Sequence, residues 1–262
     1  MVGCRGVFNG AHVVFPADDS LARDLALEAG ERLLKLRVSG QSADELRKAG
    51  DLGSQDFLAA ELTRHRPGDA VLSEEAADSH ARLSAERVWI IDPLDGTREF
   101  GEEGRTDWAV HVALWERGEL TAGAVALPAQ DKVLSTAEPP PPPPPPADPL
   151  RLVVSRSRPP EFVQRLAGEL GAVLVPLGSA GAKTAAVITG EVDAYVHSGG
   201  QYEWDSAAPV AVARSAGLHA SRIDGSNLRY NSEEPWMPDI LICPDSLADR
   251  LLKAISAVQQ RQ

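Results

Sequence analysis

The chain has 262 residues, of which 43% are hydrophobic and 24% charged, and its formal net charge is −12. This length allows one large domain or two ordinary ones, and the composition is that of a globular protein. Such an acidic surface argues against nucleic acid or an anionic membrane as the main partner. It does not exclude a small phosphorylated substrate, because bound cations can reverse the local field.

The cysteine pattern and the N-terminal sequence favour a cytoplasmic protein. Cys4 and Cys243 are the two cysteines, and they show no spacing typical of a disulfide framework or a thiolate metal site. Residues 1–16 lack the charged head and long apolar core of a secretion signal. No stretch approaches the ~18 consecutive apolar residues of a membrane span.

The first half of the chain is predicted to mix helices and strands. Apolar residues at helical spacing predict a helix over residues 18–36. Glycines indicate a turn at 49–53, and a second helix is predicted at 56–65. Branched and aromatic residues then predict strands, which lie at residues 70–73, 87–91, 108–115 and 120–127.

A run of eight prolines, residues 139–146, follows these elements. Proline fixes φ and lacks a ladder donor, so the run is predicted to be a stiff polyproline II connector, with a docking peptide as the alternative. Three segments are therefore expected. They are an N-terminal metal-binding α+β subdomain (1–138), a connector (139–149) and a C-terminal α/β subdomain that completes the active site (150–262).

The second half is predicted to alternate strands with helices, as α/β proteins do. The predicted strands cover residues 152–154, 173–176 and 194–197. The predicted helices cover residues 160–170, 181–189 and 205–216.

The clearest chemical signature is Asp92-Pro93-Leu94-Asp95-Gly96-Thr97, which follows an apolar strand. Asp92 and Asp95 bracket a proline that cannot continue a ladder, so both carboxylates can point into one small space. Crowded carboxylates repel each other, and a bound hard cation such as Mg²⁺ relieves that repulsion. Gly96 lets the backbone approach closely, and the N–H groups that follow could hold a phosphate.

Other interpretations of this segment are a calcium-binding EF-hand loop and an acidic turn without function. Residues 92–103 have an acid at each end of a twelve-residue stretch, as that loop does. The loop, however, needs other residue types where this chain has Leu94, Gly96 and Thr97. A strand also precedes the segment where an EF-hand has a helix.

Other residues fit structural explanations when taken one at a time. Glu74 and Glu75 are typical of a solvated turn, and Asp56 and Asp205 are typical helix N-caps. The histidines lack the paired spacing of a zinc site, and His111 is interpreted as a core histidine within a strand.

Taken in order, three motifs resemble the inositol monophosphatase superfamily of Mg²⁺-dependent, lithium-inhibited phosphatases. They are Ser73-Glu74-Glu75, Asp92-Pro93-Leu94-Asp95-Gly96-Thr97 and Trp204-Asp205. The resemblance implies an α/β fold of the layered αβαβα sandwich type, with an α+β N-terminal half and an α/β C-terminal half. Within the superfamily, Thr97-Arg98-Glu99-Phe100 and Ala180-Gly181-Ala182-Lys183 resemble the 3′(2′),5′-bisphosphate nucleotidases of the CysQ type.

The resemblance also implies residue roles. Two or three Mg²⁺ ions would be held by four carboxylates and one main-chain carbonyl, those of Glu74, Asp92, Asp95 and Asp205 and of Leu94. The groups that activate or steer the attacking water would be Asp56, Glu74 and Thr97. The groups that face the substrate would be the backbone N–H groups of Gly96 and Thr97, together with Asp205. Lys183 and Arg98 could pair with a second phosphate, with a solvated helix face as the alternative for both.

The implied activity is hydrolysis of the 3′-phosphate of 3′-phosphoadenosine 5′-phosphate to AMP by metal-activated water. This reaction would clear an inhibitory by-product of sulfate assimilation. The alternatives within the same fold are inositol monophosphatase and fructose-1,6-bisphosphatase activity, although residues 197–200 lack the glutamate that grips inositol. An inactive metal or nucleotide sensor and a scaffold built on the proline run are alternatives from other classes. Relatives are often dimers, which makes a homodimer compatible with the resemblance.

Overall fold

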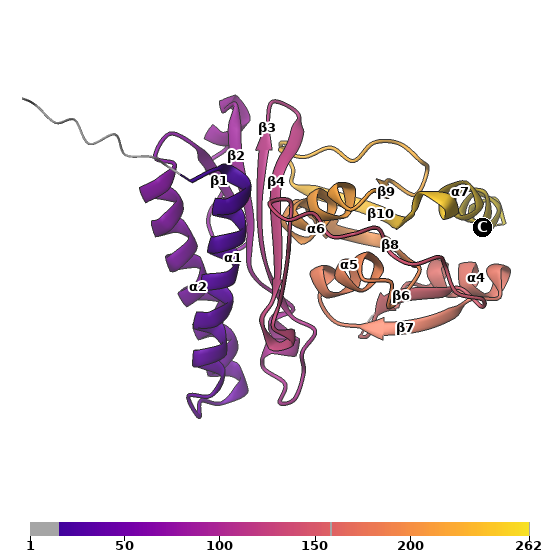
Figure 1. The fold of residues 1–262 in the computed structure, drawn as a ribbon, viewed down its shortest axis with the longest axis horizontal. Helices are drawn as coiled ribbons and strands as arrows, with labels where there is room; N and C mark the ends of the chain where they lie inside the picture. The colour runs from indigo at the N-terminus through magenta and orange to yellow at the C-terminus, as the bar shows by residue number, and fades with distance from the viewer. Residues whose placement is uncertain (1–15, 158, 262) are drawn as a thin grey trace, which may run out of the picture.

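The computed structural model describes residues 16–157 and 159–261. The expectations about Cys4 and a secretion signal lie outside these residues. Across the described residues, helices alternate with sheets in five layers (Figure 1), which confirms the predicted αβαβα class. No helix of the described ranges has both the length and the apolar character needed to cross a membrane.

Helices form three of the layers (Figure 1). The outer layer on the N-terminal side consists of α1 (Asp18–Arg37) and α2 (Ala43–His65). The layer between the two sheets consists of α5 (Ala180–Ile188) and α6 (Glu203–Ser215). The outer layer on the C-terminal side consists of α4 (Glu161–Leu170) and α7 (Asp245–Gln259).

The first sheet has the strand order β1-β2-β3-β4-β5, with one parallel pair, β1 with β2. Its strands are β1 (Ala70–Ser73), β2 (Arg87–Asp95), β3 (Ala109–Glu116), β4 (Glu119–Leu127) and β5 (Lys132–Ser135). Short helical turns connect parts of this sheet, namely η1 (Ala81–Ser84), α3 (Thr97–Phe100) and η2 (Pro128–Gln130).

The second sheet has the order β7-β6-β8-β10-β9, in which β6 pairs in parallel with β7 and β8. Its strands are β6 (Arg151–Ser155), β7 (Val173–Leu177), β8 (Ala194–Tyr202), β9 (Leu218–Ser221) and β10 (Trp236–Pro244). The proline run lies between β5 and β6, and thus connects the two sheets.

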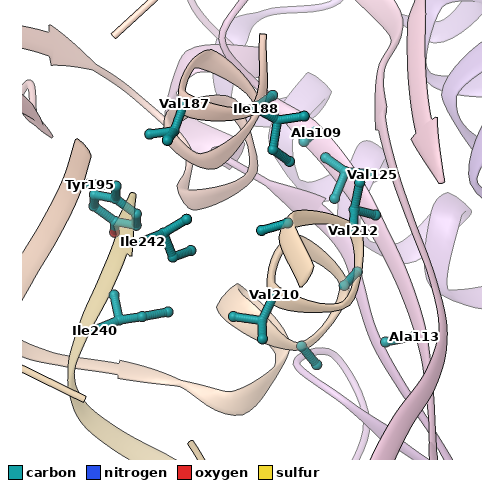
Figure 2. Packing of buried hydrophobic residues seen from close by; sticks show 14 of the residues in the cluster. Ala109, Ala113, Val125, Val187, Ile188, Tyr195, Val210, Val212, Ile240 and Ile242 are labelled. Carbon is teal, nitrogen blue, oxygen red and sulfur yellow. The ribbon is translucent and has the colours of Figure 1, made fainter. Parts of the chain in front are cut away.

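The two halves share a hydrophobic core (Figure 2). This cluster combines Ala109 and Val125 of the first sheet with Val187 of α5, Val212 of α6 and Ile242 of the second sheet. Its members are fully or almost fully buried. The predicted subdomain boundaries fall between the sheets and, as limits of folding units, stay a prediction.

A bulge in β2 brings both motif carboxylates to one side of the sheet. Asp92 pairs with His111 of β3, and the next pair along the strands is Asp95 with Ala109. Two residues of β2 therefore lie between these pairs, opposite a single residue of β3. Residues three apart in a regular strand point to opposite faces. The extra residue at this irregularity reverses that alternation, so Asp92 and Asp95 can face the same cluster.

The turn predicted at residues 49–53 is wrong, because these residues lie inside α2. Gly50 occupies a close contact between α2 and the motif. A Cβ at this position would lie 2.8 Å from Leu94 and 2.9 Å from Phe100. The glycine thus provides space for packing and does not break the helix.

Replacing Gly50 by alanine should therefore destabilise the protein, whereas Gly53→Ala should not. Overpacking a core costs roughly 1–3 kcal/mol. Gly53 faces open space, since no atom other than its chain neighbours and the backbone of its own helix lies within 4 Å of the Cβ position. Gly53→Ala should gain about 0.5–1 kcal/mol from lower chain entropy. Urea denaturation of both variants would measure this difference, and equal effects would contradict the packing role of Gly50.

Candidate metal and phosphate site

Asp92 and Asp95 lie buried at the end of β2, with exposed fractions of 1% and 6%. One carboxylate oxygen of Asp92 accepts the N–H of Leu94 at 3.1 Å. Asp95 accepts the N–H groups of Ala180 at 3.2 Å and Gly181 at 2.7 Å. Asp95 therefore joins the first sheet to the beginning of α5 in the second half.

Glu74 and Asp205 come to the same place from other elements. Glu74 follows β1 at the solvent-exposed rim, and Asp205 lies in the first turn of α6. Desolvation and repulsion from Asp205 and Asp95 raise the pKa of Glu74 to about 7. Desolvation and repulsion from Asp95 raise the pKa of Asp205 to about 6. The structure thus brings together all four acids that the sequence motifs singled out.

Burial and the three neighbouring acids also hold the pKa of Asp92 well above its ordinary range. Asp92, Asp95 and His111 each offer a ligand atom, and these atoms lie within 4.8 Å of one another. A bound cation would relieve the repulsion that raises these pKa values. The carboxylate oxygens therefore fit a metal ion, and oxygen donors favour a hard one.

His111 supports this cluster from β3. The side chain is fully buried, as predicted for a core histidine. Its Nδ1 lies 3.0 Å from the carbonyl oxygen of Trp204, and its Nε2 lies 3.1 Å from Asp95. Both neighbours are acceptors, so the arrangement favours a proton on each ring nitrogen, and in that form His111 holds Asp95 and is not itself a metal ligand. Burial opposes the charged ring, but the ion pair with Asp95 raises the pKa of His111.

From the sequence, His111 is predicted only to be buried within a strand. The register between β2 and β3 shows that it also contacts Asp95. Gly181 packs directly against the ring, and a Cβ there would overlap Nε2. The main chain of α5 and the imidazole thus converge on the same carboxylate. Although burial favours its neutral form, pairing with His111 lowers the pKa of Asp95.

Thr97 has Asp51 as its acidic partner, and not the predicted Asp56. The hydroxyl oxygen of Thr97 lies 3.1 Å from the Asp51 carboxylate and 3.0 Å from the carbonyl oxygen of Leu94. Burial, followed by repulsion from Glu75, raises the pKa of Asp51 to about 6. Asp56 is exposed on α2, and the structure does not bring it to Thr97. The mistaken turn at residues 49–53 hid Asp51, because it concealed the helix that carries this residue.

Two further side chains fix α2 against the motifs. The hydroxyl of Ser54 donates to the carbonyl of Pro93 at 2.7 Å, and that of Ser73 donates to Gln55 at 2.6 Å. These bonds set the position of Asp51 relative to the motif, because all three α2 residues lie within about one turn.

A cavity of about 880 Å³ opens beside the cluster. Its lining includes Asp95, Asp205, Gly96 and Thr97, together with Lys183 and Arg98. Lys183 is buried rather than on a solvated helix face; its ammonium donates to the carbonyl of Gly178, and burial lowers its pKa. Arg98 is mostly solvated and pairs with Glu102 at 3.3 Å.

Comparisons with known proteins agree with this fold. The model of the inositol monophosphatase family matches residues 16–260. A 3'-phosphoadenosine 5'-phosphate phosphatase of Mycobacterium leprae is 49% identical over 257 residues, covering 93% of this chain and 95% of the relative. One from Mycobacterium bovis is 51% identical over 239 residues, covering 87% and 90%.

A solved structure gives the same result at the level of the fold. CysQ from Bacteroides thetaiotaomicron, described as a bacterial member of the inositol monophosphatase family, superposes with a TM-score of 0.76 at 26% identity. The match covers 87% of this chain and 97% of that one. The chain belongs to the inositol monophosphatase family.

Without metal, the acid cluster should make the protein less stable as the pH rises. Acids whose pKa is raised by folding stabilise the folded state below their unfolded pKa, near about 4. That contribution is lost as the pH rises through about 6 for Asp205 and about 7 for Glu74. Urea denaturation in a chelator should show this loss between about pH 4 and 7, and Asp92→Asn should reduce it by on the order of 1–2 kcal/mol.

Asp56→Asn is the matched control, because Asp56 is exposed and lies outside the cluster. It should keep the pH profile of the unmodified protein. Adding a divalent cation at neutral pH should restore stability to the unmodified protein but not to Asp92→Asn. Parallel pH profiles for all three proteins would contradict the electrostatic coupling.

Proposed function

We propose that this chain is a Mg²⁺-dependent phosphatase that removes the 3′-phosphate of 3′-phosphoadenosine 5′-phosphate. The observation that carries the proposal is the cluster of four mutually repelling acids beside a cavity that also contains Lys183. The names and the 49% and 51% identities of the mycobacterial relatives support this substrate. The products are AMP and inorganic phosphate.

The carboxylates of the cluster and one main-chain carbonyl would hold two or three Mg²⁺ ions; these groups belong to Glu74, Asp92, Asp95 and Asp205 and to Leu94. When bound, the ions would supply Lewis-acid catalysis for an in-line displacement at phosphorus. The single proton of the Thr97 hydroxyl can go to Asp51 or to the carbonyl of Leu94, so this carbonyl is free to bind an ion when Thr97 donates to Asp51.

Thr97 and Asp51 would move the proton of the attacking water. The Thr97 hydroxyl can donate to Asp51 while its oxygen accepts a proton from water. The water oxygen forms the new bond to phosphorus as the bond to the 3′ oxygen breaks, and the leaving oxygen takes a proton from solvent. With its pKa raised only to about 6, Asp51 is ionised at neutral pH and can accept the proton.

Main-chain geometry at the start of α3 would position the transferred phosphate. Gly96 has φ +83°, a left-handed conformation, and its Cβ would crowd Ser179 at 3.0 Å. The N–H groups at the beginning of a helical turn lack partners within the helix and can bind phosphate oxygens. Lys183, buried in the same cavity, would attract the second phosphate.

Replacing Asp51 should reduce turnover far more than replacing Asp56. Removing a general base typically costs 10²–10⁴-fold, so Asp51→Asn should lower kcat by roughly 10²-fold or more with little change in KM. Asp56→Asn should stay within about twofold of the unmodified enzyme. Phosphate release at saturating Mg²⁺ measures both, and the reverse order would refute the assignment of Asp51.

The substrate preference can be tested with three phosphate esters and Mg²⁺. We expect kcat/KM for 3′-phosphoadenosine 5′-phosphate to exceed the values for inositol 1-phosphate and fructose 1,6-bisphosphate by roughly 10²-fold, as buried polar recognition groups allow. Asp92→Asn serves as the inactive control, and lithium should inhibit the reaction. A preference for inositol phosphate would support the proposal that the protein is a phosphatase but contradict the proposed substrate.

A further inference from the structure

Two large aromatic side chains remain exposed beside the acid cluster. Tyr202 ends β8 and is 44% exposed, and Trp236 begins β10 and is 49% exposed. Both line the cavity that contains Asp95 and Asp205. Neighbouring apolar groups left exposed at a cavity indicate that something covers them during function.

Ring packing holds both side chains in place. Tyr202 stacks on Trp204 with ring centroids 4.6 Å apart and planes 10° apart. Trp236 meets Tyr202 edge-on, with centroids 5.2 Å apart and planes at 80°. Gly200 has φ +90°, and a Cβ there would overlap the Trp236 ring. The glycine is therefore needed for this arrangement.

A buried carboxylate fixes the chain segment that leads into Trp236. Glu203 is 1% exposed and accepts the N–H groups of Asn231 at 2.7 Å and Ser232 at 2.9 Å. The aromatic surface is thus ordered without a ligand. Such preorganisation lowers the entropic cost of binding.

Charges of both signs surround this cavity. Lys183 and Arg98 contribute cations to its lining, beside the acids Asp95, Glu99 and Asp205. Near Trp236, by contrast, Glu233 and Glu234 are exposed and line an adjoining cavity with the same two rings. A phosphate would be repelled from the aromatic end, whereas an uncharged planar group would not.

Gln201 adds a polar group that lacks a partner. It is 8% exposed and lines the same cavity. One end of its amide lies 3.5 Å from the Tyr195 hydroxyl, and the other end has no hydrogen-bond partner among the described residues. A buried amide without a partner is unfavourable, so the Gln201 side chain would gain by turning its amide toward a ligand with a matching polar edge.

We propose that Tyr202, Trp236 and Gln201 form a subsite for the nucleobase of the substrate. The base would stack on the face of Trp236 and lie beside Tyr202, and its polar edge would bond the Gln201 amide. The inference rests on the proposed function, because it assumes a nucleotide. The N–H of Tyr202 donates to Asp205 at 2.6 Å, which places the rings next to the acid cluster. A substrate that carries its base and its 3′-phosphate on one ribose requires such proximity.

The test compares 3′-phosphoadenosine 5′-phosphate with an abasic analogue, the methyl riboside 3,5-bisphosphate, which keeps both phosphates. Stacking on an aromatic side chain is worth ≈ 1–3 kcal/mol, so Trp236→Leu should reduce the preference for the nucleotide by roughly 5- to 100-fold, mainly through KM. Trp236→Phe should retain most of it. The control is Val173→Ala, which removes an apolar side chain that is 49% exposed on β7, outside this cavity.

Calorimetry with AMP gives a readout that does not depend on turnover. Trp236→Leu and Gly200→Ala should each weaken AMP binding roughly tenfold. AMP binding that depends on Trp236 supports the subsite even if the true substrate is another nucleotide, so the two proposals can fail separately. Unchanged AMP affinity and unchanged preference in Trp236→Leu would overturn the subsite. Loss of self-association in that variant, with unchanged kinetics, would assign the rings to an interface between copies and would also overturn it.

Discussion

The candidate site depends on the carboxylate of Asp95. This side chain belongs to the first sheet, yet its partners are the first N–H groups of α5 and the imidazole of His111. His111 in turn contacts the carbonyl of Trp204, the residue before Asp205. One buried carboxylate therefore aligns β2, β3, α5 and α6. A negative charge at the beginning of a helix is also favourable, because the helix dipole is positive there.

Placing the acids of the cluster together lowers the stability of the folded state. A role in catalysis explains this arrangement better than a role in stability. Four acids from three elements lie close together, and burial together with their mutual repulsion raises the pKa values of Glu74, Asp92 and Asp205. A protein selected for stability alone would separate or neutralise such groups. The shared core (Figure 2) packs β1, β2 and α6 together, and these elements carry or lead into the four acids. A cation that binds the cluster is attracted by the same carboxylates that repel one another.

The cavity beside the cluster combines two chemically different kinds of group. Its lining includes the cations Lys183 and Arg98 and the aromatic rings of Tyr202 and Trp236. A molecule with two phosphates and a planar base matches both. Inositol phosphate has no planar group for the aromatic rings, whereas the substrate in the names of the mycobacterial relatives has one.

The sequence by itself determined the family, the alternation of helices and strands, and the four acids of the cluster. These features depend on local patterns, such as an apolar strand that ends in Asp92-Pro93-Leu94-Asp95, and local patterns can be recognised without knowledge of packing.

The tertiary structure decided the positions and partners of Asp51, His111 and the aromatic pair. The sequence indicated a turn at Gly50, because a glycine usually interrupts a helix. Its place inside α2 is explained by its close contact with Leu94 and Phe100, which the sequence does not show. The register of β3 against β2 placed His111, and that of β8 against β10 placed Tyr202 beside Trp236. Contacts between strands and helices far apart in sequence leave no periodic signal along the chain, so only the folded structure could reveal them.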